Sequence, residues 1–150
     1  MAGSARILLV EDNELNRSLV RAILTRTKHP ALQDAILVEA PDLAHARKSL
    51  ADQVFDVVLL DVHLPDGSGL TLAREITDGS AQRPALVALT AAALPREQAA
   101  ALEAGCETFL AKPYTRDEAL AKVREALERR QNAGADAGLE RRKRPRLRGK

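Results

Sequence analysis

The sequence predicts an α/β fold in which helices cover both faces of a five-stranded parallel sheet. Five short apolar segments alternate strictly with five segments whose apolar residues recur at helical spacing. Such alternation is typical of strand–helix–strand units, which build parallel sheets. Residues 57–60 (VVLL) are apolar at every position, as expected of a strand buried on both sides. These observations together predict a doubly wound sheet.

The first half of the chain contains three strand–helix pairs. The three strands share a short apolar sequence and are expected at residues 6–10, 35–40 and 55–60. A helix with one apolar face is expected after each strand, at about residues 15–27, 43–50 and 69–77. Asp42 follows a proline and can cap the second helix. The sequence Pro65-Asp66-Gly67 has turn-forming chemistry and separates the third strand from its helix by a loop.

The second half contains two further pairs. Strands are expected at residues 85–89 and 108–111, and helices at about 95–104 and 116–130. Pro95 suits the first position of a helix, and Gly105 is placed to end it. Thr115 can cap the last helix. Lys112-Pro113 ends the fifth strand.

Length and composition indicate one cytoplasmic domain with a charged tail. The chain has 150 residues, no apolar run long enough to span a membrane, and no signal-peptide pattern at its start. Cys106 is the only cysteine, which excludes an intrachain disulfide and indicates a small buried residue. Residues 1–130 form the predicted globule. Residues 131–150 are expected to be an Ala/Gly-rich linker and a basic tail without stable structure, with seven basic side chains against two acidic ones.

Reactive side chains follow four of the five predicted strands. Glu11 and Asp12 follow the first strand, Asp61 the third, Thr90 the fourth and Lys112 the fifth. The carboxyl ends of parallel strands lie at one edge of the sheet, so these groups are expected to converge. Oxygen ligands without cysteine or paired histidines favour Mg²⁺, and a hydroxyl and an ammonium beside it favour a phosphoryl group.

Each of these residues also has an ordinary structural explanation. Acids favour the start of a helix, Thr90 can be a capping hydroxyl, Lys112 can pair with any surface acid, and Asp61 can bond loop amides. Four such groups at four strand ends are hard to explain as independent accidents. The sequence contains neither a P-loop nor a G-x-G-x-x-G motif after the first strand, which disfavours a nucleotide site.

Four motifs give the sequence a specific resemblance. LLVEDN at 8–13, VVLLDVHLPDGSGL at 57–70, ALTA at 88–91 and FLAKPY at 109–114 resemble the response-regulator receiver domain of two-component signalling. The resemblance covers about residues 5–130 and is strongest to receivers attached to hybrid sensor kinases, although free-standing, single-domain receivers share these motifs. It implies a flavodoxin-like (βα)5 fold with strand order 2-1-3-4-5.

The resemblance also implies roles for individual residues. Asp61 would accept a phosphoryl group from a phosphohistidine as an acyl phosphate. Mg²⁺ (or Mn²⁺) would be held by Asp12, Asp61 and the backbone carbonyl of His63, with Glu11 acting through water. Lys112 would hold a phosphoryl oxygen. The switch residues would be Thr90 and Phe109.

The same resemblance implies a phosphoacceptor that signals by changing its protein contacts, and not a turnover enzyme. Its partners would be a sensor histidine kinase or a histidine phosphotransfer protein, and a downstream protein bound by the face from Pro95 to Arg130. Ser68 stands where an Asp is common, and both can cap the following helix. The cognate kinase, the output partner and any phosphorylation-driven homodimer are left open.

Two other functions stay open at this point. In the first, the protein is an adaptor whose basic tail binds nucleic acid or an anionic membrane while the receiver gates it. In the second, it is a phosphorelay intermediate or a phosphate sink. The tail is too short for a helix-turn-helix domain and contains no aromatic residue for base stacking.

Overall fold

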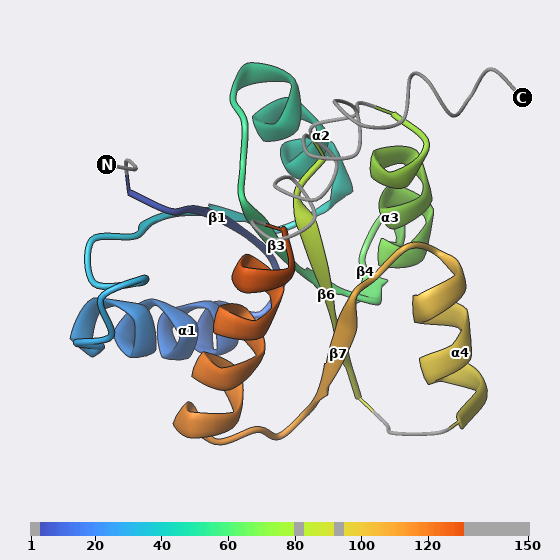
Figure 1. The fold of residues 1–150 in the computed structure, drawn as a ribbon. Coiled ribbons are helices and arrows are strands. Elements are labelled where there is room, and N and C mark those ends of the chain that lie inside the picture. The colour runs from blue at the N-terminus through green and yellow to red at the C-terminus, as the bar shows by residue number, and fades with distance from the viewer. Residues whose placement is uncertain (1–3, 80–82, 92–94, 131–150) are drawn as a thin grey trace, which may run out of the picture.

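The fold is a parallel sheet between two layers of helices, as predicted (Figure 1). The computed structural model describes residues 4–79, 83–91 and 95–130. Five parallel strands lie side by side in the order β2 (Ile36–Ala40), β1 (Arg6–Val10), β3 (Val57–Asp61), β6 (Ala85–Thr90) and β7 (Thr108–Ala111). Counting only these five strands, this is the predicted order 2-1-3-4-5.

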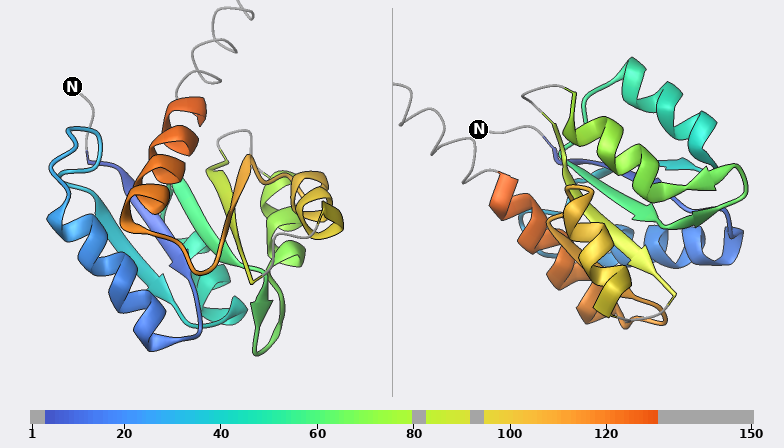
Figure 2. Two further views of the ribbon diagram at one scale, coloured as in Figure 1. Left: turned by 90° about the horizontal axis from the view of Figure 1, so that it is seen from below. Right: turned by 90° about the vertical axis from the view of Figure 1, so that its right-hand side faces the viewer.

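The helices divide between the two faces of the sheet (Figure 2). One face is covered by α1 (Glu14–Arg26) and the C-terminal helix, residues 116–130, which pack together through residues such as Val20 and Val123. The other face is covered by α2 (Leu43–Asp52), α3 (Gly69–Thr77) and α4 (Pro95–Glu103). The helices therefore follow the predicted segments closely.

Side chains that alternate along each strand reach opposite cores. In β1, Ile7 and Leu9 belong to the core under α1, whereas Leu8 and Val10 belong to the core under α2 and α3. All five residues of β3 are buried. A strand covered on both faces needs apolar residues at every position, which explains the uninterrupted apolar runs in the sequence.

The predicted caps are present at the helix ends. The Asp42 carboxylate accepts a hydrogen bond from the backbone N–H of His45 at 2.8 Å, and the Ser68 hydroxyl accepts one from Leu70 N–H at 3.1 Å. Thr115 and Glu118 cap each other's backbone N–H groups at 3.1 and 2.9 Å. These bonds satisfy donors that the first turn of a helix leaves without a partner.

One element lies where the sequence predicts only a loop. Strands β4 (His63–Leu64) and β5 (Gly67–Ser68) form a small antiparallel hairpin between β3 and α3. Two residues per strand are too few to show an alternating pattern, so sequence periodicity could not reveal it. This hairpin immediately follows the acidic end of β3.

The structure tests some of the predictions made from composition, and others fall outside the described residues. Cys106 is buried as predicted, and burial raises the pKa of its thiol to about 12. In the described part of the chain, none of the helices combines the length and apolar character that crossing a bilayer requires. The predicted linker and basic tail, residues 131–150, lie outside the described residues.

Candidate functional site

The reactive side chains predicted from the sequence gather at the carboxyl edge of the sheet. Glu11 and Asp12 directly follow β1, Asp61 ends the adjacent β3, Thr90 ends β6, and Lys112 directly follows β7. Because these four strands are consecutive neighbours, their ends lie side by side. Four separate segments of the chain thus contribute to one site.

The centre of the site is a cluster of three carboxylates. Glu11, Asp12 and Asp61 each place a carboxylate oxygen within 4.8 Å of the others. Glu11 and Asp61 are only 1% and 6% exposed, whereas Asp12 is exposed to solvent. Carboxylates at this separation repel one another, and burial strengthens the repulsion because less solvent screens it.

Lys112 compensates part of this charge. Its Nζ donates hydrogen bonds to Glu11 Oε1 at 2.8 Å and to Asp61 Oδ2 at 2.9 Å. Burial opposes the charged ammonium, but the hydrogen bonds and charges of Glu11 and Asp61 outweigh it and raise the pKa of Lys112. One ammonium against three carboxylates leaves a formal charge of −2.

The donor set fits a hard divalent cation. The cluster offers only carboxylate oxygens, it is negatively charged after Lys112 is counted, and exposed Asp12 leaves it open to solvent on one side. Mg²⁺ prefers oxygen ligands and is typically bound by one or two carboxylates while it keeps several waters. These residues could therefore hold Mg²⁺ or Mn²⁺.

The backbone around Asp61 is held at several points. The N–H of His63 donates to Asp61 Oδ1 at 3.1 Å, so both carboxylate oxygens of Asp61 are oriented. Val62 N–H donates to Leu89 O at 3.1 Å, and Gly69 N–H donates to Val62 O at 2.8 Å. A Cβ atom on Gly69 would lie 2.0 Å from the Asp61 carbonyl oxygen, so only glycine fits there.

Thr90 has an unusual environment at the end of β6. It is 2% exposed, and its Oγ1 has no hydrogen-bond partner among the described residues. Its carbonyl accepts a bond from the backbone N–H of Lys112 at 2.7 Å, which ties it to the end of β7. A buried hydroxyl without a partner costs free energy and in a native structure calls for an explanation.

Phe109 lies on the same side of the sheet as Thr90. Thr90 is two residues after Ala88 in β6 and so faces the same side, and Ala88 is in register with Phe109 in β7. Phe109 is partly buried and packs against the core that contains Ala88. The two predicted switch residues therefore face the same side of adjacent strands, two residues apart in register.

The structure adds residues that the sequence analysis did not identify. Arg17 Nη1 donates to the backbone carbonyl of Glu11 at 2.8 Å, and Asn13 N–H donates to Glu11 Oε2 at 3.1 Å. Gly69 belongs to the same group because of its contact with Asp61. Spacing along the chain gave no signal for these contacts, because each depends on the path of a loop at the strand ends.

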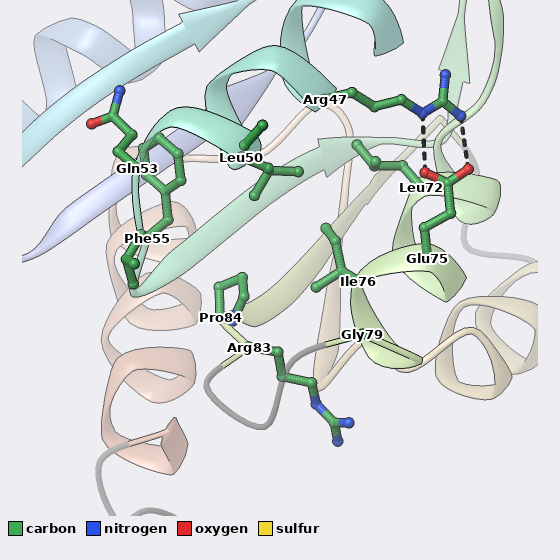
Figure 3. Close-up of a pocket in the computed structure, with 12 residues that line it drawn as sticks. Arg47, Leu50, Gln53, Phe55, Leu72, Glu75, Ile76, Gly79, Arg83 and Pro84 are labelled. Atoms are coloured by element: carbon green, nitrogen blue, oxygen red, sulfur yellow. Dashed lines mark hydrogen bonds and ion pairs between the residues drawn. The ribbon is translucent and has the colours of Figure 1, made fainter.

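A separate groove lies at the opposite, amino edge of the sheet, between α2 and α3 (Figure 3). It encloses about 370 Å³ and is largely apolar, with Phe55 and Ile76 among its lining residues. Arg47 and Glu75 are paired across it, with an Nη2–Oε2 distance of 2.9 Å. None of the carboxylate-cluster residues lines this groove, so it is distinct from the candidate site.

Comparisons with known proteins agree with this arrangement. The family described as the response regulator receiver domain matches residues 7–124. DivK of Brucella abortus, named a polar-differentiation response regulator, is 30% identical over 110 residues, which cover 73% of this chain and 85% of DivK. Protein PetR of Rhodobacter capsulatus is 36% identical over 129 residues, which cover 85% of this chain, but the chain spans only 51% of PetR.

A solved structure supports the same assignment. The receiver domain of the sensor histidine kinase PA1611 from Pseudomonas aeruginosa, solved with a magnesium ion in its active-site cleft, superimposes with a TM-score of 0.71. It is 31% identical, with 84% of this chain and 99% of that chain covered. By its matching family, its relatives and its fold, the chain belongs to the response-regulator receiver domains of two-component signalling.

Proposed function

We propose that this protein is a phosphoacceptor in which Asp61 takes a phosphoryl group from a phosphohistidine and the phosphorylated protein changes its protein contacts. The observation that carries the proposal is the position of Asp61. Its carboxylate is buried, it contacts Lys112 and His63 N–H, and it lies within 4.8 Å of two other acids. A nucleophile, an ammonium and a cation-binding cluster together suit phosphoryl transfer.

The proposed metal is Mg²⁺ or Mn²⁺. Asp12, Asp61 and the backbone carbonyl of His63 would hold it, and Glu11 would act through water. When bound, the ion supplies positive charge that stabilises the oxygens of the transferring phosphoryl group. The charge of the cluster and the magnesium-containing receiver of PA1611 support this assignment.

The proposed chemical step uses Asp61 and Lys112. A carboxylate oxygen of Asp61 attacks phosphorus, the phosphorus–nitrogen bond of the phosphohistidine breaks, and the imidazole nitrogen keeps the electron pair. Lys112 stays between Glu11 and the acceptor and pairs with a phosphoryl oxygen as negative charge arrives there. The product is an acyl phosphate on Asp61.

Thr90 and Phe109 would report the new phosphoryl group to the rest of the molecule. Thr90 Oγ1 has a hydrogen to donate and no described partner, and a phosphoryl oxygen on Asp61 would supply an acceptor. Movement of Thr90 would change the space available to Phe109 on the same side of the sheet. We infer that the face from Pro95 to Arg130 carries this change to a downstream protein.

A second candidate is a role as a relay intermediate. The PA1611 receiver is part of a sensor histidine kinase, and this chain is 31% identical to it. A relay intermediate would return its phosphoryl group to a histidine phosphotransfer protein, whereas an output regulator would keep it until hydrolysis. Transfer of radiolabel from the phosphorylated protein to a histidine protein would therefore distinguish the two functions.

The direct test is phosphorylation with acetyl phosphate and Mg²⁺, read by intact mass. We expect one acid-stable, base-labile phosphoryl group on the wild-type protein and none on Asp61→Asn. Asp52→Asn is a matched control, because Asp52 is an exposed acid that pairs with Lys48 on the surface of α2. Phosphorylation that persists in Asp61→Asn would refute the proposal.

Lys112→Ala extends the same experiment. We expect it to weaken the conformational response more than the labelling, because the ammonium also couples the phosphoryl group to the end of β7. Equal losses of labelling and response would instead assign Lys112 to binding alone. The response can be followed by backbone amide shifts of residues 108–111.

A further inference from the structure

The turn of the β4–β5 hairpin is bonded to the start of α2. Asp66 Oδ1 accepts a hydrogen bond from Leu43 N–H at 2.9 Å, and Asp66 Oδ2 accepts one from Ala44 N–H at 3.2 Å. Leu43 and Ala44 are the first two residues of α2. This helix already has a cap of its own, because Asp42 accepts from His45 N–H. The Asp66 carboxylate therefore connects the turn of the hairpin to α2, although these two segments are far apart in the sequence.

The hairpin is held at its base by the bond from Gly69 N–H to Val62 O, whereas its turn is held to α2 through Asp66. Its two strands have two residues each, and such a short hairpin is not stable by itself in water. Most of its residues are exposed, although Leu64 is partly buried against the core. A Cβ atom on Gly67 would lie 2.9 Å from Leu43 Cδ1, so the turn packs closely on the helix that Asp66 caps.

The other end of the hairpin is part of the phosphoacceptor site. His63 is the first residue of β4, and its N–H donates to Asp61 Oδ1 at 3.1 Å. The backbone carbonyl of the same residue is one of the proposed metal ligands. A displacement of the hairpin would thus move both groups relative to Asp61. The bonds from Asp66 to α2 restrict that displacement.

We propose that Asp66 is a positioning residue, which ties the acceptor loop to α2 and so sets the affinity of the carboxylate cluster for Mg²⁺. This inference rests on the proposed function, since it concerns the metal of the same site. Outer contacts that orient metal ligands commonly change metal affinity by about 10- to 100-fold when they are removed. Asp66 acts through the backbone of His63 and does not itself touch the cluster.

The test compares two caps of one helix. Asp66→Ala removes the bond between hairpin and helix, whereas Asp42→Ala removes the helix's own cap and leaves the hairpin tied. Mg²⁺ affinity of the full chain is measured by calorimetry, together with hydrogen exchange of the His63 amide. We expect Asp66→Ala to bind Mg²⁺ about tenfold more weakly and to exchange this amide faster, while Asp42→Ala changes neither.

Asp66→Asn provides a graded variant, because its single amide oxygen can accept one of the two bonds, and it should lie between wild type and Asp66→Ala. If Asp66→Ala does not fold, Asp66→Asn carries the test. Unchanged Mg²⁺ affinity in the Asp66 variants, or an equal loss in Asp42→Ala, would overturn the inference. Failure of the proposed function would look different, since wild-type protein would then bind no Mg²⁺ and accept no phosphoryl group.

Discussion

At the residue scale, Thr90 holds a polar atom in an unfavourable environment. Its hydroxyl is buried and has no partner among the described residues, and such a group typically costs about 1–3 kcal/mol. In the proposed function, a phosphoryl oxygen on Asp61 would give this hydroxyl an acceptor, and a difference of this kind between two states shifts their populations. The proposed switch role of Thr90 would explain this cost.

This explanation predicts opposite effects on stability and on signalling. Thr90→Val keeps the shape of the side chain and removes the unpaired hydroxyl, so the unphosphorylated protein should become more stable by about 1 kcal/mol. The same variant should accept a phosphoryl group but lose the change at Phe109. Urea unfolding measures the first effect, and amide shifts of residues 108–111 measure the second.

Thr90→Ser serves as the control, since it keeps the hydroxyl and should keep the response. Loss of stability in Thr90→Val with an unchanged response would contradict the role given to Thr90. The comparison is informative because, for a threonine with only a structural role, the change to valine should lower stability and leave the response unchanged.

At the scale of elements, the end of α4 depends on a glycine. Gly105 has a φ of +105°, and a Cβ atom there would lie 1.9 Å from Thr77 Oγ1 at the end of α3. That hydroxyl donates to Ala104 O at 2.9 Å. Two helices that cover the same face of the sheet are therefore joined where both end, and no larger residue fits between them.

Gly105→Ala should destabilise the protein by about 2 kcal/mol or more, from the unfavourable backbone conformation together with the clash. Thermal or urea unfolding measures this loss. Gly79→Ala is a milder comparison, because a Cβ at Gly79 would meet the Glu75 carbonyl oxygen at 3.2 Å, a tight contact but not a severe clash, and its φ is not positive. Equal stability of the two variants would contradict both the strain assigned to the positive φ and the clash with Thr77.

At the scale of the whole molecule, the described part of the chain ends in contacts with the globule. Arg130 Nη1 lies 3.3 Å from Asp56 Oδ1, and its Nε donates to Arg83 O at 3.3 Å. The C-terminal helix buries Val123 and Leu127 in the core shared with α1. These contacts anchor the helix through its last described turn.

A chain shortened to residues 1–130 should therefore fold with unchanged stability, within about 0.5 kcal/mol. If the basic residues after Glu140 bind an anionic surface, the shortened chain should also lose salt-sensitive retention on DNA or anionic vesicles. Urea unfolding and retention at two salt concentrations measure these effects. A marked loss of stability would place residues 131–150 within the folded domain, and unchanged retention would exclude the adaptor function.

Most of the fold could be predicted from local sequence signals. Buried parallel strands require uninterrupted apolar runs, and the helices that cover them require apolar residues at helical spacing. The strand at residues 57–60 and the apolar face of α1 could therefore be predicted from the sequence pattern alone. The reactive residues at the strand ends could be named for the same reason, because parallel strands bring their carboxyl ends to one edge.

Only the tertiary structure decided how those residues meet. The bonds of Lys112 to Glu11 and Asp61, the unpaired hydroxyl of Thr90 and the tie from Asp66 to α2 depend on distances between segments remote in sequence. Chain order specifies which groups reach the edge of the sheet. Their hydrogen bonds and mutual charges depend on loop paths and packing, which leave no periodic signal in the sequence.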